Sequence, residues 1–275
     1  MNKFYRTFPL IFLLLTGCVT LYKPNVIHSP MIKEKGEFSS TAALGLSGSG
    51  IFNLQAAYGI SDHWALMADG MYHYKKSLFE DDISGKRTLR MRFAEGGIGY
   101  FKVTGAKKNS LFQCYGGAGS GHSFNIISNL DGADPEVVAR YNNVFVQPGI
   151  VLLNKKYMIS FDLRANYVMV NNINAYKYEE FDMWSTNFRY YENLSLDFVL
   201  MEPTITFKGL GNKLKFVAQV GATLPVIHTT SYFDVNTVSV LLFPLIKFNV
   251  GINYTIGKKH SNKVREIESL GFEKL

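Results

Sequence analysis

The chain has 275 residues, of which 47% are hydrophobic and 14% aromatic, and its formal net charge is +7. Its 21 Phe, 16 Tyr and 24 Gly are atypical of a plain helical domain and favour many strands, in which aromatic residues are enriched. Only two cysteines occur, Cys18 and Cys114, so no disulfide framework is possible if Cys18 is acylated.

The first 17 residues have the organisation of a secretory signal peptide. Lys3 and Arg6 precede an apolar run from Phe8 to Leu15, and small residues follow it. This run is too short to span a bilayer, which takes about 20 apolar residues, and no later run is long and apolar enough for a membrane helix. Any membrane integration of the mature chain is therefore expected to use strands.

The segment Leu15-Thr16-Gly17-Cys18 resembles the lipobox of bacterial lipoproteins. The resemblance implies that Cys18 is acylated and becomes the first residue of the mature chain. Removing residues 1–17 leaves 27 basic against 22 acidic residues, a net charge of +5. Export excludes nucleic acid as the partner of this charge. Two interpretations of the positive charge remain: it contacts anionic lipid headgroups, or it is solvated charge on loops.

Residues 18–36 contain Pro24 and Pro30 and show no clean periodicity, so we expect a lipidated periplasmic tether. Alternation of apolar and polar residues begins at Glu37 and continues almost to the end of the chain. From Ile159 to Tyr167 every second residue is apolar or aromatic, and Ser, Asp, Arg and Asn lie between them. This alternation predicts strands with one apolar face, although a soluble sandwich also alternates.

The lengths of the connections favour a barrel over a sandwich. The alternating segments predict about ten strands, an even number, as closed bacterial barrels require, at 37–47, 51–60, 63–75, 87–103, 110–123, 141–153, 157–170, 194–208, 213–226 and 240–256. Apart from the first hairpin near Gly48–Gly50, short connections at 61–62, 104–109, 154–156 and 209–212 alternate with long ones at 76–86, 124–140, 171–193 and 227–239. Short periplasmic turns and long outer loops are typical of outer-membrane barrels. We therefore predict an all-β, antiparallel, up-and-down transmembrane β-barrel over residues 37–256.

Several segments, in their order along the chain, resemble a group of Bacteroidota-type lipoproteins predicted to form outer-membrane β-barrels. They are Tyr22–Asn25, Lys33–Glu37, Gln55–Ile60, Ser61–His63, Gly96–Tyr100, Gln147-Pro148 and Glu202-Pro203. The resemblance implies a location and a fold, but no activity, cofactor or catalytic residue. Lipoproteins of this kind that reach the cell surface can carry an acidic stretch after the cysteine. Val19–Tyr22 has no acid, so the anchor is expected in the inner leaflet of the outer membrane.

The expected orientation follows from the same loop lengths. The first strand starts on the periplasmic side, and an even number of strands returns the chain to that side. Both termini are therefore expected in the periplasm, and residues 257–275 are expected to form a polar periplasmic tail.

Alternation directs a set of polar side chains into the predicted lumen: Gln55, Asp69, Glu95, Gln147, Asp162, Arg164, Glu202, Thr204, Gln219 and Lys247. A barrel of about ten strands is only slightly wider than the size that side chains can fill. Opposite charges there should pair, because unpaired buried charges are costly. We expect Glu95, Asp162, Arg164, Glu202 and Lys247 to form a polar network that plugs the lumen. A narrow selective pore or a ligand site is the alternative.

Arg90 and Arg92 lie at the outer end of a predicted strand, on the face expected to meet lipid. A guanidinium group is suited to bidentate contact with phosphate. These residues are therefore expected to contact lipopolysaccharide, and solvated charge at the base of a loop is the alternative.

No catalytic or metal-binding residues are expected. His122 and Ser123 lie at the outer rim, where outer-membrane lipid hydrolases place such residues, but neighbours in a strand point to opposite faces. Ser120 shares a face with His122, yet no third residue is evident to orient a base. Asp62 and His63 supply too few ligands for a metal.

Aromatic residues mark the ends of the predicted strands and one long loop. Those at the strand ends predict interfacial girdles, with cross-strand packing as the alternative: Tyr58, Trp64, Tyr72, Tyr74, Tyr100, Tyr157 and Tyr254. The aromatic loop Asn171–Tyr191 is suited to a carbohydrate or protein partner, or to packing over the barrel mouth.

Together these features predict a monomeric, lipid-anchored outer-membrane β-barrel with a non-catalytic, structural or surface-interaction role. The alternatives are a narrow channel or transporter for small solutes and a lipid-modifying hydrolase.

Overall fold

The computed structural model describes residues 25–45, 51–76, 86–128, 136–154, 156–182, 185–209, 211, 213–228 and 246–257. The predicted signal peptide, Cys18 and the tail from residue 258 onward lie outside the described residues. Within the described part of the chain, no helix is long and apolar enough to cross a membrane.

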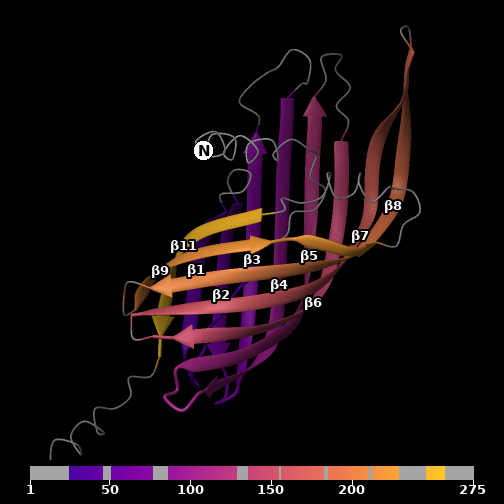
Figure 1. Cartoon of the computed structure of the whole chain (residues 1–275). Helices are drawn as coiled ribbons and strands as arrows, with labels where there is room; N and C mark the ends of the chain where they lie inside the picture. Colours follow the sequence, from indigo (N-terminus) through magenta and orange to yellow (C-terminus); the bar gives the residue numbers. More distant parts are fainter. Residues whose placement is uncertain are drawn as a thin grey trace, which may run out of the picture.

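The described strands pair antiparallel in one sheet that closes on itself (Figure 1). Their bounds are β1 Phe38–Gly45, β2 Ile51–Gly59, β3 Trp64–Lys76, β4 Lys86–Thr104, β5 Ser110–Ser128, β6 Glu136–Leu153, β7 Tyr157–Asp182, β8 Ser185–Gly209, β9 Leu214–Ala222, β10 Leu224–His228 and β11 Ile246–Ile256. Strands β1 to β8 pair in chain order, β9 pairs with β8 and β11, and β11 pairs with β1. β10 continues β9 along β8, so the wall has ten strands. The prediction of an all-β antiparallel barrel is confirmed.

The strands form because their residues alternate between an apolar outer face and a polar inner face. In β7, Phe161 and Leu163 are 48% and 43% exposed, whereas Asp162 and Arg164 beside them are buried. The other strands also bury polar side chains and expose Leu, Ile, Val, Phe and Tyr side chains on the outer face of the barrel. A soluble sandwich would bury its apolar face. The side-chain burial therefore distinguishes the barrel from the sandwich, which periodicity alone does not.

The two ends of the barrel differ. The short-turn end carries the connections 60–63, 105–109, 154–156 and 210–213. At the opposite, long-hairpin end, β7 and β8 rise beyond the neighbouring strands (Figure 1).

Two of the predicted long loops are wrong, because strands occupy most of their length. The predicted loop 171–193 is a continuation of β7 to Asp182 and of β8 from Ser185, and the predicted loop 124–140 is shortened by β5 and β6 in the same way. The register pairs Tyr176 with Tyr190 and Tyr178 with Phe188. The backbone of these residues is therefore paired as strand, and the predicted loop is part of the hairpin.

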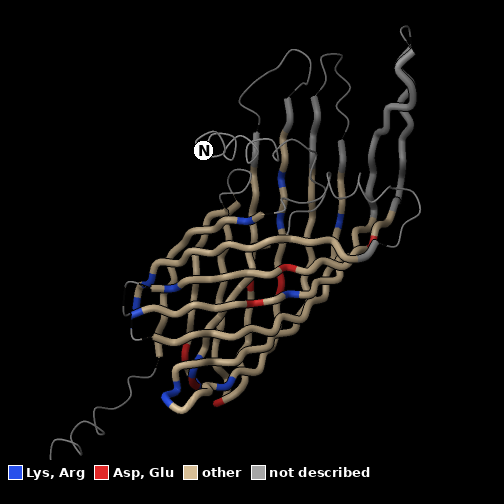
Figure 2. Tube along the Cα trace, viewed as in Figure 1, with Lys and Arg blue, Asp and Glu red and all other residues tan. Residues whose placement is uncertain are grey.

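The interior is filled in layers. An apolar cluster that includes Phe93 and Tyr141 lies towards the long-hairpin end. A second apolar cluster, which includes Phe101 and Tyr115, lies towards the short-turn end. Between them the inward side chains are polar, and Figure 2 shows several acidic residues at mid-height of the wall.

Candidate functional site

The lumen is occupied by the chain's own N-terminal segment. Every residue from Asn25 to Ile32 is buried, and His28 and Ile32 are 0% exposed. The expectation that residues 18–36 form a tether outside the barrel is therefore wrong for residues 25–32. The physical reason lies in the hydrogen bonds that the wall makes to this segment, which has no periodic pattern of its own. Residues 25–32 are called the lumen segment below.

Glutamine side chains from different strands hold the backbone of the lumen segment. The Nε2 groups of Gln55, Gln219 and Gln147 donate to the carbonyl oxygens of Val26, Ile27 and His28, at 3.1, 2.8 and 2.8 Å. These donors come from β2, β9 and β6. Because three separated strands bind consecutive residues, the segment is fixed from several sides of the lumen.

Lys208 and Gln113 continue this pattern towards the short-turn end. Lys208 Nζ donates to the carbonyl oxygen of Ser29 at 2.6 Å. Gln113 accepts from the Met31 amide at 3.2 Å and donates to Asp162 Oδ1 at 2.8 Å. Asp162 thus belongs to the group that holds the segment.

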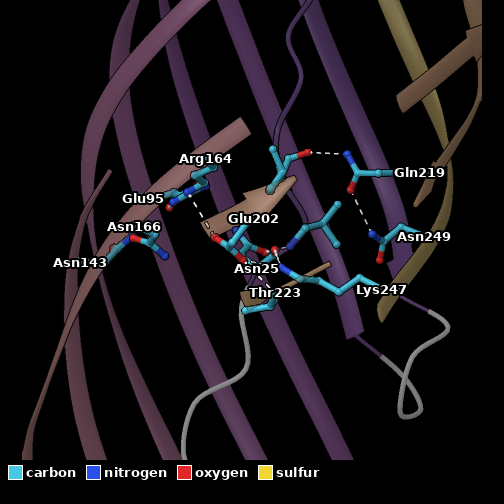
Figure 3. Close-up of polar contacts among 12 residues, drawn as sticks. Asn25, Glu95, Asn143, Arg164, Asn166, Glu202, Gln219, Thr223, Lys247 and Asn249 are labelled. Carbon is cyan, nitrogen blue, oxygen red and sulfur yellow. Dashed lines mark hydrogen bonds and ion pairs between the residues drawn. The ribbon is translucent and has the colours of Figure 1, made fainter. Parts of the chain in front are cut away.

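An ionic network lies beside Asn25 at the other end of the segment (Figure 3). Arg164 makes a bidentate pair with Glu95, and its Nε lies 3.8 Å from Glu202 Oε2. Lys247 Nζ lies 2.5 Å from Glu202 Oε1 and also donates to the Asn25 carbonyl oxygen at 3.3 Å. Two cations and two carboxylates therefore balance in the interior, as buried charge requires.

All ten inward positions expected from alternation lie inside the barrel and are buried: Gln55, Asp69, Glu95, Gln147, Asp162, Arg164, Glu202, Thr204, Gln219 and Lys247. Four of the five residues expected in one network, Glu95, Arg164, Glu202 and Lys247, are joined in it by ion pairs. Gln113, Lys208 and Asn249 were missed. Lys208 follows Thr204 and Thr206 at every second position of β8, so alternation could have predicted that its side chain points inward.

Arg90 and Arg92 lie on the outer face and are exposed. Their guanidinium groups lie 5.6 Å from the Tyr74 ring centre and 5.9 Å from that of Tyr72. The register places Arg92 opposite His122 on β5, and His122 in turn opposite Arg140 on β6. His122 and Arg140 are also exposed, so basic groups from three adjacent strands face outward at one level.

The candidate hydrolase residues do not converge. Ser123 is buried on the inner face, whereas His122 and Ser120 are exposed on the outer face. His63 lies at the short-turn end, with its Nδ1 atom 3.3 Å from the Phe101 carbonyl oxygen. Within the described ranges, no group of three or more His, Cys, Asp or Glu side chains is placed to hold a metal ion.

The girdle candidates Tyr58, Trp64, Tyr72, Tyr74, Tyr157 and Tyr254 are exposed on the outer face. At the short-turn end, Trp64 packs edge-on against Tyr100, with ring centres 5.7 Å apart. The Trp64–Tyr100 pair therefore fits both interpretations of these aromatic residues, cross-strand packing and an interfacial girdle.

No family model matches the chain, and no curated protein matches it. Solved structures that it resembles include the translocator domain of the autotransporter NalP from Neisseria meningitidis, at 9% identity and a TM-score of 0.40 over 79% of this chain and 86% of that chain. Another is a mutant of the TodX monoaromatic hydrocarbon channel, at 8% identity and a TM-score of 0.27 over 80% of this chain and 88% of that chain. Both are outer-membrane β-barrel proteins, and the likeness concerns the fold alone.

Proposed function

We propose that the protein is a lipid-anchored, integral outer-membrane β-barrel with a sealed lumen and a non-catalytic, structural or surface-interaction role. One observation carries this proposal: side chains of the barrel wall donate hydrogen bonds to the backbone carbonyl oxygens of four consecutive residues of the lumen segment, Val26 to Ser29. A conducting pore of this width would need that space for solute. The sealed interior therefore favours a scaffold over the channel alternative.

The apolar outer face supports the membrane assignment. Leu54, Ile150 and Ile252 are 54%, 56% and 58% exposed, and they come from strands on different parts of the wall. An exposed apolar band of this extent is costly in water and suits a hydrocarbon environment. With short periplasmic turns, the short-turn end faces the periplasm and the long-hairpin end faces the cell exterior.

The membrane assignment is tested with a variant that lacks the anchor. Cys18→Ala should still require detergent for extraction, and it should migrate differently on gels before and after boiling. A Cys18→Ala protein that is soluble without detergent would contradict integral insertion. Turnover of phospholipid or lipopolysaccharide acyl chains by the purified protein would contradict the non-catalytic role.

The basic groups on β4 support a second role, contact with a phosphate-bearing lipid such as lipopolysaccharide. Arg90 and Arg92 face outward near the long-hairpin end and form no ion pair with another described residue. Replacing both with Glu should reduce the lipopolysaccharide that co-purifies. Lys102→Glu is the matched control, because Lys102 is exposed on the same strand at the short-turn end. Equal co-purification from all three proteins would rule this contact out.

A further inference from the structure

The rim of the barrel at the short-turn end is strongly basic. Six lysine side chains there are exposed, and none of them forms an ion pair with another described residue. They are Lys35, Lys102, Lys107, Lys108, Lys156 and Lys213, and they are called the lysine ring below. Among the described side chains of this rim, Asp62 is the one exposed acid. The positive charge of the lysine ring therefore exceeds the exposed acidic charge that the described rim offers.

The lysines are spread around the barrel and are not gathered on one side of it. Lys35 precedes β1, three members lie at the β4–β5 hairpin, and Lys156 and Lys213 lie in the β6–β7 and β8–β9 connections. These are separate positions on the circumference, because the strands close in chain order. Figure 2 shows Lys and Arg positions along this rim. A protein partner would cover one side of the barrel, whereas lipid surrounds it, so the distribution favours lipid.

Aromatic residues of the outer face set the height of the lysine ring. Lys102 lies two residues beyond Tyr100 on β4, and the Tyr100 ring packs against Trp64. Lys156 directly precedes Tyr157, which is exposed on the outer face. Two residues of a strand cover about 7 Å, and exposed Trp and Tyr side chains of barrels lie at the membrane interface. Because the connections at this end are short, the ammonium groups lie at the level of the lipid phosphates.

We propose that the lysine ring binds the phosphate groups of anionic phospholipids, such as phosphatidylglycerol, in the leaflet that surrounds the short-turn end. The proposal rests on the integral membrane assignment above, and on the orientation proposed there this is the inner leaflet of the outer membrane. A lysine ammonium group is a compact charge on a flexible stem, which suits headgroups that exchange within a fluid leaflet. The methylene stem lies along apolar surface while the charge reaches the phosphate.

The two ends of the barrel differ in the type of cation that they present. Among the described side chains near the long-hairpin end, the exposed basic groups are Arg90, Arg92, Arg140 and His122. Arginine is suited to bidentate contact with one phosphate in a defined geometry. The lysine ring has point charges on every side of the barrel, which suit a surrounding layer of lipid. We therefore expect the two ends to select different lipids.

Quenching of Trp64 fluorescence measures which lipid lies at the lysine ring. The chain has two tryptophans, so Trp184→Phe leaves Trp64 as the single reporter. The full mature chain with this change is refolded into vesicles of equal amounts of phosphatidylcholine and phosphatidylglycerol, in which one of the two lipids is brominated. Brominated phosphatidylglycerol should quench Trp64 more strongly. Its association constant relative to phosphatidylcholine should be about twofold to fivefold higher, because each lysine near an anionic surface contributes about fivefold at most.

Three lysines on the hairpin next to Trp64 should carry this preference. Lys102→Gln combined with Lys107→Gln and Lys108→Gln should make quenching by the two lipids equal, whereas Arg at the same three positions should preserve the difference. Equal quenching with the lysine ring intact would overturn the inference, and so would a preference that survives in the Gln variant. Quenching by neither lipid would contradict the membrane assignment itself, and the inference with it. Gel mobility before and after boiling confirms that each variant is folded.

Discussion

Arg164 joins the polar parts of the interior. It binds Glu95 in bidentate geometry, approaches Glu202, and lies 3.8 Å from the centre of the Phe145 ring. Its inward orientation was predictable from strand alternation, because Asp162 and Arg164 share the inner face of β7. Its stacking on Phe145 was not predictable, because it depends on how the wall curves.

Removing the charge of Arg164 should destabilise the barrel strongly. Arg164→Met leaves Glu95 buried without a partner, and breaking a buried ion pair costs about 3–5 kcal/mol. Urea unfolding of the protein refolded in lipid vesicles measures this loss. Lys102→Met, an exposed control, should change the unfolding free energy by less than about 0.5 kcal/mol. An Arg164→Met protein as stable as the Lys102→Met protein would contradict the structural role of the network.

The pair can also be replaced as a unit. Arg164→Met combined with Glu95→Leu should recover part of the stability lost in Arg164→Met, because no uncompensated charge remains at the Glu95 position. The same urea titration measures this recovery. A double variant with a lower unfolding free energy than Arg164→Met alone would show that Glu95 stabilises the barrel mainly through a partner other than Arg164.

Gly149 makes room for Asp162. A Cβ atom at this position would collide with Asp162 Oδ1, which accepts from Gln113, while Asp162 Oδ2 accepts from Ser160. Gly149→Ala should therefore cost about 1–3 kcal/mol, as overpacking does. Gly70→Ala is the matched control, because the nearest atom to its Cβ would be the Leu54 carbonyl oxygen at 4.0 Å. Equal unfolding free energies for the two variants would contradict the close packing around Asp162.

Strand positions were predictable because a ring of strands between two media imposes a strict alternation. The predicted strands at 51–60 and 157–170 start where β2 and β7 start. The length of the β7–β8 hairpin was missed, because residues rich in Tyr and Asn suit an exposed loop as well as a hairpin. The lumen segment was missed for a different reason: its backbone bonds go to wall side chains, which impose no periodicity on the sequence.

The β7–β8 extension should be separable from the barrel. Among the described residues, the part from Ala175 to Tyr191 pairs only within the hairpin. Replacing Ala175–Tyr191 by Asn-Gly should leave the difference in gel mobility between unboiled and boiled samples unchanged, since Asn-Gly supports a tight hairpin turn. If the extension is the interaction surface, attachment of cells to host glycans or proteins should fall. Loss of the folded gel band would contradict the separation.

At the scale of the whole molecule, the barrel has an apolar exterior, a polar layer between two apolar clusters in its interior, and the lumen segment inside it. These three features explain one another: the wall supplies the hydrogen-bonding groups that residues 25–32 need, and those residues fill space that the wall side chains leave. Alternation of the wall residues was sufficient to predict the polar layer of the interior, but not the two apolar clusters on either side of it. It was not sufficient to predict the occupant, because alternation reports which way a side chain points and not what it meets.

Single-channel recording in planar bilayers tests the sealed lumen most directly. The full mature chain should show no conductance steps, whereas a variant that lacks residues 25–32 should show them. The variant with the shortened β7–β8 hairpin is the control for leakage caused by mutation, and it should stay silent. Steady conductance steps from the full mature chain would contradict a sealed lumen and favour the narrow channel.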